Sequence, residues 1–237
     1  MFRGQMVRLK RLPNVMYAIQ IFLKKVSIEC SSQNADGRIN SCSDEDTIIR
    51  NLVGEFRDRI VIPEKRNWYD ILIRDYRYGW IPINIKSTTT KTSDNTGNIA
   101  MCVHVYTDAE LNLRQENTYN SGEMSSVLMC KFRETKFNRN PKKDYYFVVV
   151  NKQNTRDIII NSVKGLTSLT PNINNLPFQV QWDRNREFKY GNIKNKVRLF
   201  VECIQKPKPS WHETFLKDMR AYGQFRTEEV STEKRKM

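Results

Sequence analysis

The sequence predicts a single domain of the α/β class, and three observations lead to this prediction. Two amphipathic helical patterns come first, a stretch of alternating apolar and polar residues follows, and short runs rich in β-branched and aromatic residues come later. The 237 residues are enough to bury one sizeable core, and 39% of them are hydrophobic. We therefore expect one globular domain over residues 1–223, with a charged and flexible tail over residues 224–237.

Two helices are expected in the first quarter of the chain. Apolar residues recur at helical spacing over residues 14–26, namely Val15, Ile19, Phe22 and Val26. The polar stretch 30–46 predicts a loop, and the run from Ser43 to Asp46 at its end would cap a second helix with hydroxyl and carboxylate groups. That helix is apolar on one side and carries Glu55 in its C-terminal half.

The stretch YDILIRDYRYGWIPINIK, residues 69–86, predicts a β-hairpin with its turn around residues 76–79. If the turn is centred near Arg77, residues whose numbers sum to about 154 face each other, which places Asp70 opposite Asn84. Lys86 lies two residues further along the same strand and therefore on the same face. A slip of one residue in the turn would move Asp70 to the other face of the sheet.

The remaining elements are predicted from shorter runs. Residues 99–107 are ambiguous between helix and strand, because the run is short and mixes Ala and Met with β-branched residues. Residues 145–151, 157–162 and 197–204 predict buried strands from their length and their β-branched and aromatic content. Prolines follow the last of these runs, and residues 211–222 predict a terminal helix.

The charge balance favours a polyanionic partner. Forty Lys and Arg residues against 26 Asp and Glu residues give a formal net charge of +14, so nucleic acid is the expected partner. Basic residues gather over residues 131–143 and 184–198, where they could touch backbone phosphates or belong to solvated loops. No single residue of these segments can be assigned a base contact from the sequence.

Composition also restricts the metal chemistry and the location. The five cysteines form no C-x-x-C motif or Cys/His cluster, and two histidines are too few for a zinc site of the usual kind. Free thiols in a reducing cytoplasm are the simplest interpretation. The basic and apolar start of the chain predicts an amphipathic helix rather than a targeting segment, and no apolar run is long enough to span a bilayer, so no membrane partner is expected.

An aspartate, an asparagine and a lysine at one end of a hairpin suit phosphodiester hydrolysis. Carboxylate and carbonyl oxygens are the ligands that Mg²⁺ prefers, and the metal can polarise a phosphate and present hydroxide. A nearby ammonium lowers the cost of forming the nucleophile. The alternative interpretation is structural, with Asp70 at a strand end and Lys86 exposed to solvent at a sheet edge.

The same residues resemble the PD-(D/E)xK nuclease superfamily, and in particular the type II restriction endonucleases. Tyr69-Asp70 resembles the Pro-Asp of that family, and Asn84-Ile85-Lys86 resembles its acid-x-Lys. NLVGEFRDR, with Glu55, resembles the glutamate-bearing helix that precedes the hairpin in many members. The resemblance spans about residues 44–185. It implies a restriction-endonuclease-like catalytic core over about residues 44–205, a central mixed β-sheet flanked by helices.

The resemblance implies an Mg²⁺-dependent, site-specific endonuclease that cuts double-stranded DNA as a homodimer at a short palindromic site. Asp70 would be the main metal ligand, helped by Asn84 and the backbone carbonyl of Ile85, and Lys86 would orient or activate the attacking water. Asn84 stands where the family has Glu or Asp, and either Glu55 or Asp94 would supply the missing charge. Two alternatives remain: a non-catalytic DNA-binding protein on a nuclease scaffold, and a nuclease for branched or damaged DNA.

Overall fold

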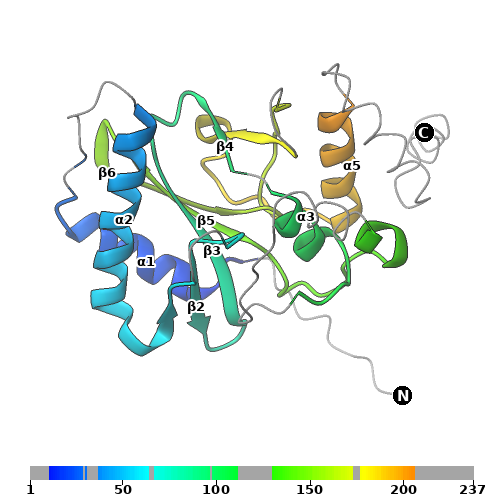
Figure 1. Cartoon of the computed structure of the whole chain (residues 1–237), viewed down its shortest axis with the longest axis horizontal. Helices are drawn as coiled ribbons and strands as arrows, with labels where there is room; N and C mark the ends of the chain where they lie inside the picture. Colours follow the sequence, from blue (N-terminus) through cyan, green and yellow to red (C-terminus); the bar gives the residue numbers. More distant parts are fainter. Residues whose placement is uncertain are drawn as a thin grey trace.

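A computed structural model of the chain describes residues 11–28, 30, 37–63, 67–96, 98–111, 130–172 and 177–205 (Figure 1). At its centre is a five-stranded mixed β-sheet with the strand order β1-β2-β3-β5-β6. The strands are β1 (Ile60–Val61), β2 (Ile71–Asp75), β3 (Gly79–Thr88), β5 (Tyr146–Asn151) and β6 (Asn154–Ser162). The predicted α/β class, with a central mixed sheet flanked by helices, is confirmed.

The β2–β3 hairpin has the register that the sequence predicts. Ile71 pairs with Ile83 and Asp75 pairs with Gly79, so paired residue numbers sum to 154. Gly79 closes the turn with a φ of 75°, a left-handed conformation that glycine adopts without steric cost. β3 then runs parallel to β5, whereas the other neighbouring strands of this sheet pair antiparallel.

Helices cover both faces of the sheet (Figure 1). On one face, α1 (Asn14–Lys25) and α2 (Gly37–Phe56) pack against alternate strand residues such as Ile83 and Ile85. On the other face, α3 (Ile99–Tyr106) and α5 (Ile193–Ile204) belong to a second core with Phe147 and Val149. Because strand side chains alternate, Asn84 and Lys86 belong to the face that carries α3 and α5.

A small second sheet lies beside the first. It consists of β4 (Ser93–Asn95) and β7 (Gln179–Gln181), which pair antiparallel. Trp182 follows β7, is fully buried, and packs edge to face on Phe147 of the central sheet. This contact joins the second sheet to the α3 and α5 side of the central sheet, close to the end of β3.

Two sequence-based expectations about secondary structure are wrong. The helix α2 begins at Gly37, so the expected loop is helical from there and Ser43 to Asp46 lie inside the helix instead of capping it. Residues 197–204 form the second part of α5, not a strand. Val197, Val201 and Ile204 are buried at helical spacing, and the Asn192 side chain caps the helix by accepting a hydrogen bond from the Lys194 N–H.

Other expectations are confirmed or lie outside the described residues. Residues 14–25 form the expected first helix, and the ambiguous run 99–107 is a helix up to Tyr106. The runs 145–151 and 157–162 are strands, as β5 and β6. The predicted helix over 211–222 and the charged tail fall outside the described residues.

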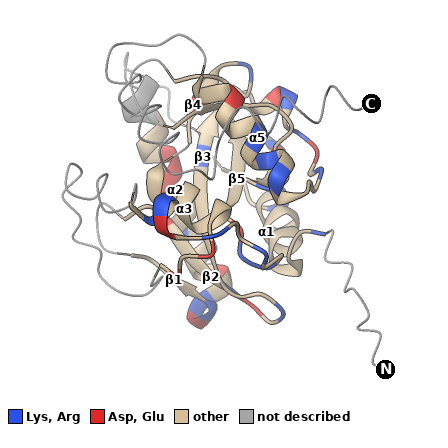
Figure 2. Cartoon of the chain, turned by 90° about the vertical axis from the view of Figure 1, so that its right-hand side faces the viewer, with Lys and Arg blue, Asp and Glu red and all other residues tan. Residues whose placement is uncertain are grey.

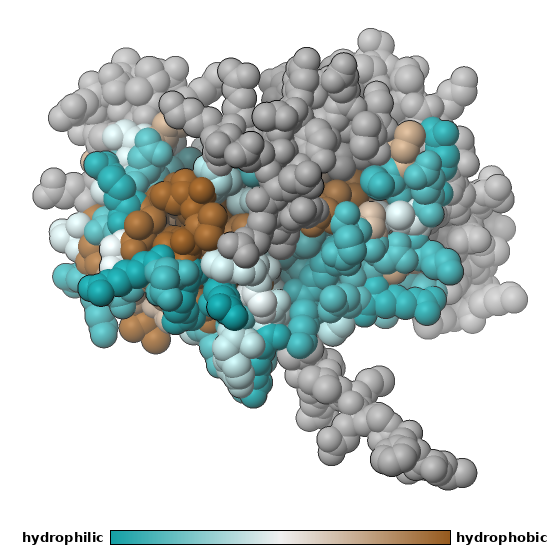
Figure 3. Space-filling view, turned by 60° about the horizontal axis from the view of Figure 1, so that its bottom comes forward, coloured by the Kyte–Doolittle hydropathy of each residue, from teal (hydrophilic) through white to brown (hydrophobic). Residues whose placement is uncertain are grey.

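The described surface has few large apolar side chains. Tyr17, Ile21, Ile62 and Tyr76 are the exposed examples among the described residues. Figure 3 shows a face on which hydrophilic residues surround an apolar patch, with smaller apolar areas beside it. Within the described part of the chain, no helix is long and apolar enough to cross a membrane.

Asp75 ties the hairpin turn to the first helix. Its Oδ1 accepts hydrogen bonds from the N–H groups of Arg77 (2.8 Å) and Tyr78 (3.1 Å), and its Oδ2 accepts one from the Val15 N–H (3.2 Å). The side chain is buried, as is its bond to the Val15 N–H, whereas the two bonds within the turn are partly buried. One carboxylate therefore satisfies two turn donors and one donor in the first turn of α1.

We expect Asp75→Ala to lower the free energy of unfolding by about 1–3 kcal/mol, because one buried and two partly buried N–H donors lose a charged acceptor. Urea unfolding followed by circular dichroism measures the change. Arg74→Ala is the control, since its side chain is exposed on the neighbouring position of β2, and it should change stability by less than about 0.5 kcal/mol. Equal stability of the two variants would contradict the role given to Asp75.

Candidate active site

The ladder of hydrogen bonds between β2 and β3 ends before the polar end of β3. Beyond it, the Asp70 side chain accepts the hydrogen bond that a neighbouring strand would otherwise accept. The last pair of the β2–β3 ladder is Ile71 with Ile83, and the Asp70 N–H still donates to the Ile83 carbonyl at 3.0 Å. Beyond that point, Asp70 Oδ2 accepts hydrogen bonds from the Ile85 N–H (2.6 Å) and from Asn84 Nδ2 (2.8 Å). The expected placement of Asp70 beside Asn84 is therefore confirmed.

The amide of Asn84 is held from two sides. Besides Asp70, its side chain interacts with the hydroxyl of Tyr145, which is fully buried and donates to the Trp68 carbonyl at 2.9 Å. The remaining atom, Asn84 Oδ1, is buried and has no hydrogen-bond partner in the described part of the chain. A buried acceptor without a partner is costly, so this oxygen is one that a bound group would stabilise.

Lys86 pairs with an acid from helix α2. Its Nζ lies 3.1 Å from Glu45 Oε1, and the two side chains are each 19% exposed. The same carboxylate oxygen accepts the Ser87 N–H at 3.4 Å, so Glu45 contacts both the side chain and the backbone of β3. Figure 2 shows basic sequence on β3 and acidic sequence on α2.

A second acid of α2 fixes the helix against the end of β3. Asp44 is 1% exposed, accepts a hydrogen bond from Ser87 Oγ at 3.1 Å, and lies 3.4 Å from Lys152 Nζ. The Lys152 N–H donates in turn to the Thr88 carbonyl at 2.9 Å. Strand β3, helix α2 and the β5–β6 turn therefore meet at one buried ion pair.

Burial and charge act in opposite directions on the ionisable groups. Burial raises the pKa values of Asp70 and Glu45, although the positive charge of Lys86 partly opposes both shifts. Burial lowers the pKa of Lys86, but the charges of Glu45 and Asp70 outweigh it, and the net pKa is raised. Lys86 therefore stays an ammonium at neutral pH, with two carboxylates close to it.

The structure does not bring Glu55 to this site, so that part of the sequence-based prediction is wrong. Glu55 is exposed near the C-terminal end of α2, ten positions from Glu45, which is about 15 Å along a helix. Asp94 lies nearer, on β4, but its two oxygens accept hydrogen bonds from Thr88 Oγ1 (3.1 Å) and Trp182 Nε1 (2.8 Å). The acid that approaches Lys86 is Glu45.

The sequence does contain a pattern that predicts helix at Asp44 and Glu45. The buried residues Phe56, Leu52 and Ile48 repeat every four positions, and one further step back reaches Asp44. Extending the apolar stripe in this way predicts that the helix continues through the acidic run and that its acids lie near the sheet. The polar composition of that run concealed the periodicity.

The residues at the hairpin end fit a hard divalent cation such as Mg²⁺. Asp70 supplies a carboxylate, and Asn84 Oδ1 is a buried oxygen without a partner. The N–H and C=O of one strand residue point to the same side, so the Ile85 carbonyl is directed to the side where its N–H meets Asp70. Within the described ranges, no three His, Cys, Asp or Glu side chains form a metal site alone, but Mg²⁺ uses one or two carboxylates and keeps several waters.

Comparison with known proteins adds no assignment. A scan against protein-family models finds no match to the chain, and a search of curated proteins also finds none.

The raised pKa of Asp70 predicts how stability depends on pH. Its folded-state pKa lies above the unfolded value, so the ionised carboxylate lowers the free energy of unfolding at neutral pH, and this cost disappears as the pH falls below the unfolded pKa. We expect Asp70→Asn to be more stable than the wild type at neutral pH, by on the order of 1 kcal/mol. The difference should vanish at about pH 3, where the wild-type carboxyl is protonated.

Urea unfolding at the two pH values measures this difference. Asp58→Asn is the control, because Asp58 is exposed and the same charge is removed without any change in a buried group. A less stable Asp70→Asn variant at neutral pH would show that the carboxylate contributes more through its hydrogen bonds than burial costs it.

Proposed function

We propose that the protein is an Mg²⁺-dependent endonuclease that cuts double-stranded DNA at specific sites, on the plan of the PD-(D/E)xK nucleases. One observation carries the proposal: the Asp70 carboxylate, the partnerless Asn84 oxygen and the Lys86 ammonium gather where the hairpin ladder ends. The five-stranded mixed sheet, in which an antiparallel hairpin is followed by a parallel strand, supports the same plan.

Each residue has a defined part in this reaction. Asp70, with the Asn84 oxygen and the Ile85 carbonyl, would hold the cation, which when bound polarises the phosphate and lowers the pKa of a water. Lys86 keeps its proton and stabilises negative charge that develops on the attacking oxygen and the phosphate. Glu45 keeps the ammonium charged and fixes its position.

The partner and the assembly follow from the same proposal. A net charge of +14 attracts the DNA backbone, and the attraction weakens as salt rises. Cutting both strands of a palindrome calls for two active sites related by a two-fold axis, so we propose a homodimer. The cysteines of the described residues are all free, which supports a reducing compartment such as the cytoplasm.

A second candidate function is supported by Asn84. Because Asn84 donates to Asp70, the carboxylate has hydrogen-bond partners without a metal. A DNA-binding protein that has lost catalysis would be stable with this pair. The two functions differ in one measurable property, which is cleavage in the presence of Mg²⁺.

Incubation of varied plasmid DNA with the wild-type protein should give discrete fragments with Mg²⁺ and none with EDTA. Asp70→Asn should reduce the rate by about a thousandfold or more, because it removes the carboxylate ligand while keeping the side-chain shape. Binding of DNA in EDTA should survive in this variant. Gel analysis of the fragments and mapping of their ends give the rate and the cut site.

Three outcomes would change the proposal. Salt-sensitive binding without cleavage at any sequence favours the non-catalytic candidate. Cleavage of branched DNA only, with linear duplex left intact, indicates a structure-specific repair nuclease. Cleavage that Asp70→Asn leaves unchanged places the chemistry elsewhere in the chain.

Glu45→Gln tests the pairing with Lys86, and Glu55→Gln is the matched control on the same helix. Since the charge of Glu45 raises the pKa of Lys86, we expect its loss to move the alkaline limb of the pH–rate profile to lower pH. The rate at neutral pH should fall about tenfold. Glu55→Gln should leave both unchanged, and a profile unmoved in Glu45→Gln would remove Glu45 from the site.

A further inference from the structure

Burial and ion pairing engage several of the basic residues of the segments 131–143 and 184–198. Lys143 and Lys196 are 7% exposed, and Arg186 pairs with Asp157 and Asp183. Lys189 lies 3.4 Å from Glu187. In contrast, the side chains of Lys136, Arg139 and Lys194 are exposed and form no hydrogen bond or ion pair with any described residue.

These three cations line one pocket. It has a volume of about 350 Å³ and is formed by Lys136, Phe137, Arg139, Asn192, Ile193 and Lys194. Among the described residues, no acidic residue lines it, and the first turn of α5, with its positive helix-dipole end, forms one wall. Residues 136–139 and 192–194 are far apart in the sequence, so it is folding that brings their positively charged side chains together.

A second pocket adjoins the first on the side of residues 136–139. It has a volume of about 270 Å³, and its lining includes Asp108 and Glu110. Both acids are engaged, since Asp108 Oδ1 accepts the Lys136 N–H at 2.9 Å and Glu110 lies 3.5 Å from Lys143 Nζ. The acid-free pocket is therefore the one that suits an anion.

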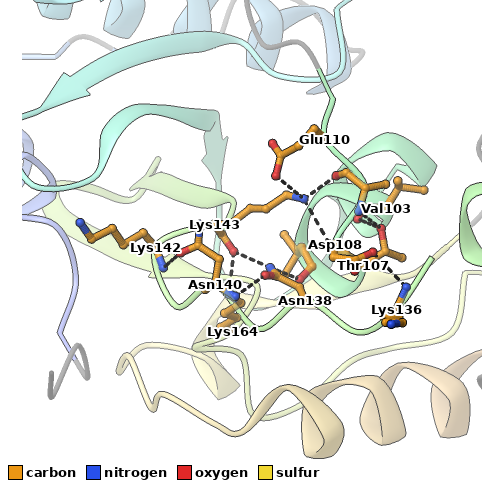
Figure 4. A network of polar contacts seen from close by, with 12 residues as sticks. Val103, Thr107, Asp108, Glu110, Lys136, Asn138, Asn140, Lys142, Lys143 and Lys164 are labelled. Carbon is orange, nitrogen blue, oxygen red and sulfur yellow. Dashed lines mark hydrogen bonds and ion pairs between the residues drawn. The ribbon is translucent and has the colours of Figure 1, made fainter. Parts of the chain in front are cut away.

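A network of buried lysines holds the loop that carries Lys136 and Arg139 (Figure 4). Lys143 Nζ donates to the carbonyls of Thr107 (3.2 Å) and Ala109, and Lys164 Nζ donates to those of Asn140 (2.9 Å) and Lys143 (2.6 Å). Both side chains are buried and donate to carbonyls of this part of the chain, so they hold the loop and are not exposed to a partner. Burial lowers the pKa values of both lysines.

Asn138 completes this network from within the loop. Its Nδ2 donates to the carbonyls of Val105 (2.8 Å) and Lys143 (3.0 Å), and its Oδ1 accepts the Asn140 N–H at 2.8 Å. The Asn138 N–H also donates to the Tyr106 carbonyl at 3.0 Å. The backbone beneath Lys136 and Arg139 is therefore fixed, so a ligand at their side chains does not need to order the loop.

We propose that the acid-free pocket formed by Lys136, Arg139, Lys194 and the start of α5 binds a backbone phosphate of nucleic acid. Three cations that pair with no described residue, carried on an ordered loop and helix, match a phosphate diester, and Arg139 can bind it with two parallel N–H donors. Phe137 gives the pocket an apolar wall against which a sugar or base can pack. The identity of the partner rests on the proposed function, whereas the pocket itself has no part in the cleavage chemistry.

The test is fluorescence anisotropy of a labelled DNA duplex in EDTA, at several salt concentrations, with Lys136→Ala, Lys194→Ala and the double variant. Each single variant should bind about tenfold more weakly, and the double variant should lower the slope of log affinity against log salt by about one, the value for one lost phosphate. Lys142→Ala is the matched control. Lys142 is exposed on the same loop but lines neither pocket, so its loss should change affinity far less.

Two results would overturn the proposal: wild-type affinity in the double variant, or a loss in Lys142→Ala equal to that in Lys136→Ala. Displacement of the DNA by millimolar inorganic phosphate at constant ionic strength would also overturn it, by assigning the pocket to free phosphate. A protein that never cuts DNA but loses binding in these variants would refute the nuclease and leave the pocket standing. A protein that cuts DNA, and whose variants bind DNA with wild-type affinity, would refute the phosphate pocket and leave the proposed nuclease standing.

Discussion

The free edge of β3 is the constraint on which the candidate site depends. Strand β2 stops at Ile71, so the backbone N–H groups of Ile85 and Ser87 face the side where no strand continues the ladder. Buried N–H groups need acceptors, and here carboxylates provide them: Asp70 accepts from Ile85, and Glu45 accepts from Ser87. Two acids are therefore placed beside Lys86 because the backbone of β3 requires acceptors there.

The two carboxylates that accept hydrogen bonds from the backbone of β3 are also the ionisable groups of the candidate site. A neighbouring strand would satisfy the same donors at a lower electrostatic cost, since burial raises the pKa values of both Asp70 and Glu45. Lys86 offsets part of that cost by lying between the two acids. Ionisable groups whose pKa values are shifted by burial and by a specific charged partner are typical of functional sites, although structural ion pairs shift them too.

The hairpin could be predicted from the sequence because its register is local. A short turn and strict alternation determine which residues oppose each other, and the pairing of Ile71 with Ile83 agrees with the arithmetic. The start of α2 could not be predicted in the same way. The buried carboxylate of Asp44 is satisfied by Ser87 and Lys152, more than forty residues away, so the polar run by itself predicts a loop.

The errors at residue 55 and at residues 197–204 have the same physical origin. Glu45 and Glu55 lie on one helix, and only the position of that helix along β3 decides which of them meets Lys86. The run 197–204 is apolar enough for a strand or a helix, and packing against α3 and the core selects the helix. Tertiary contacts decide such cases. The proposed phosphate pocket could not be predicted for a similar reason, because its two segments come together only in the folded protein.

An asparagine at position 84, in place of an acid, makes the site less negative. A carboxylate at this position would lie within hydrogen-bond distance of Asp70, and the two like charges would repel unless a cation or a proton lay between them. The amide donates to Asp70 instead, so the site folds without a cation. Asp70, Glu45 and Lys86 together then carry one net negative charge. A single negative charge attracts a divalent cation only weakly, so under the proposed function the phosphates of bound DNA supply much of the charge that holds Mg²⁺. Binding of DNA and binding of the cation then reinforce each other, and an enzyme of this kind assembles its complete metal site only on its substrate.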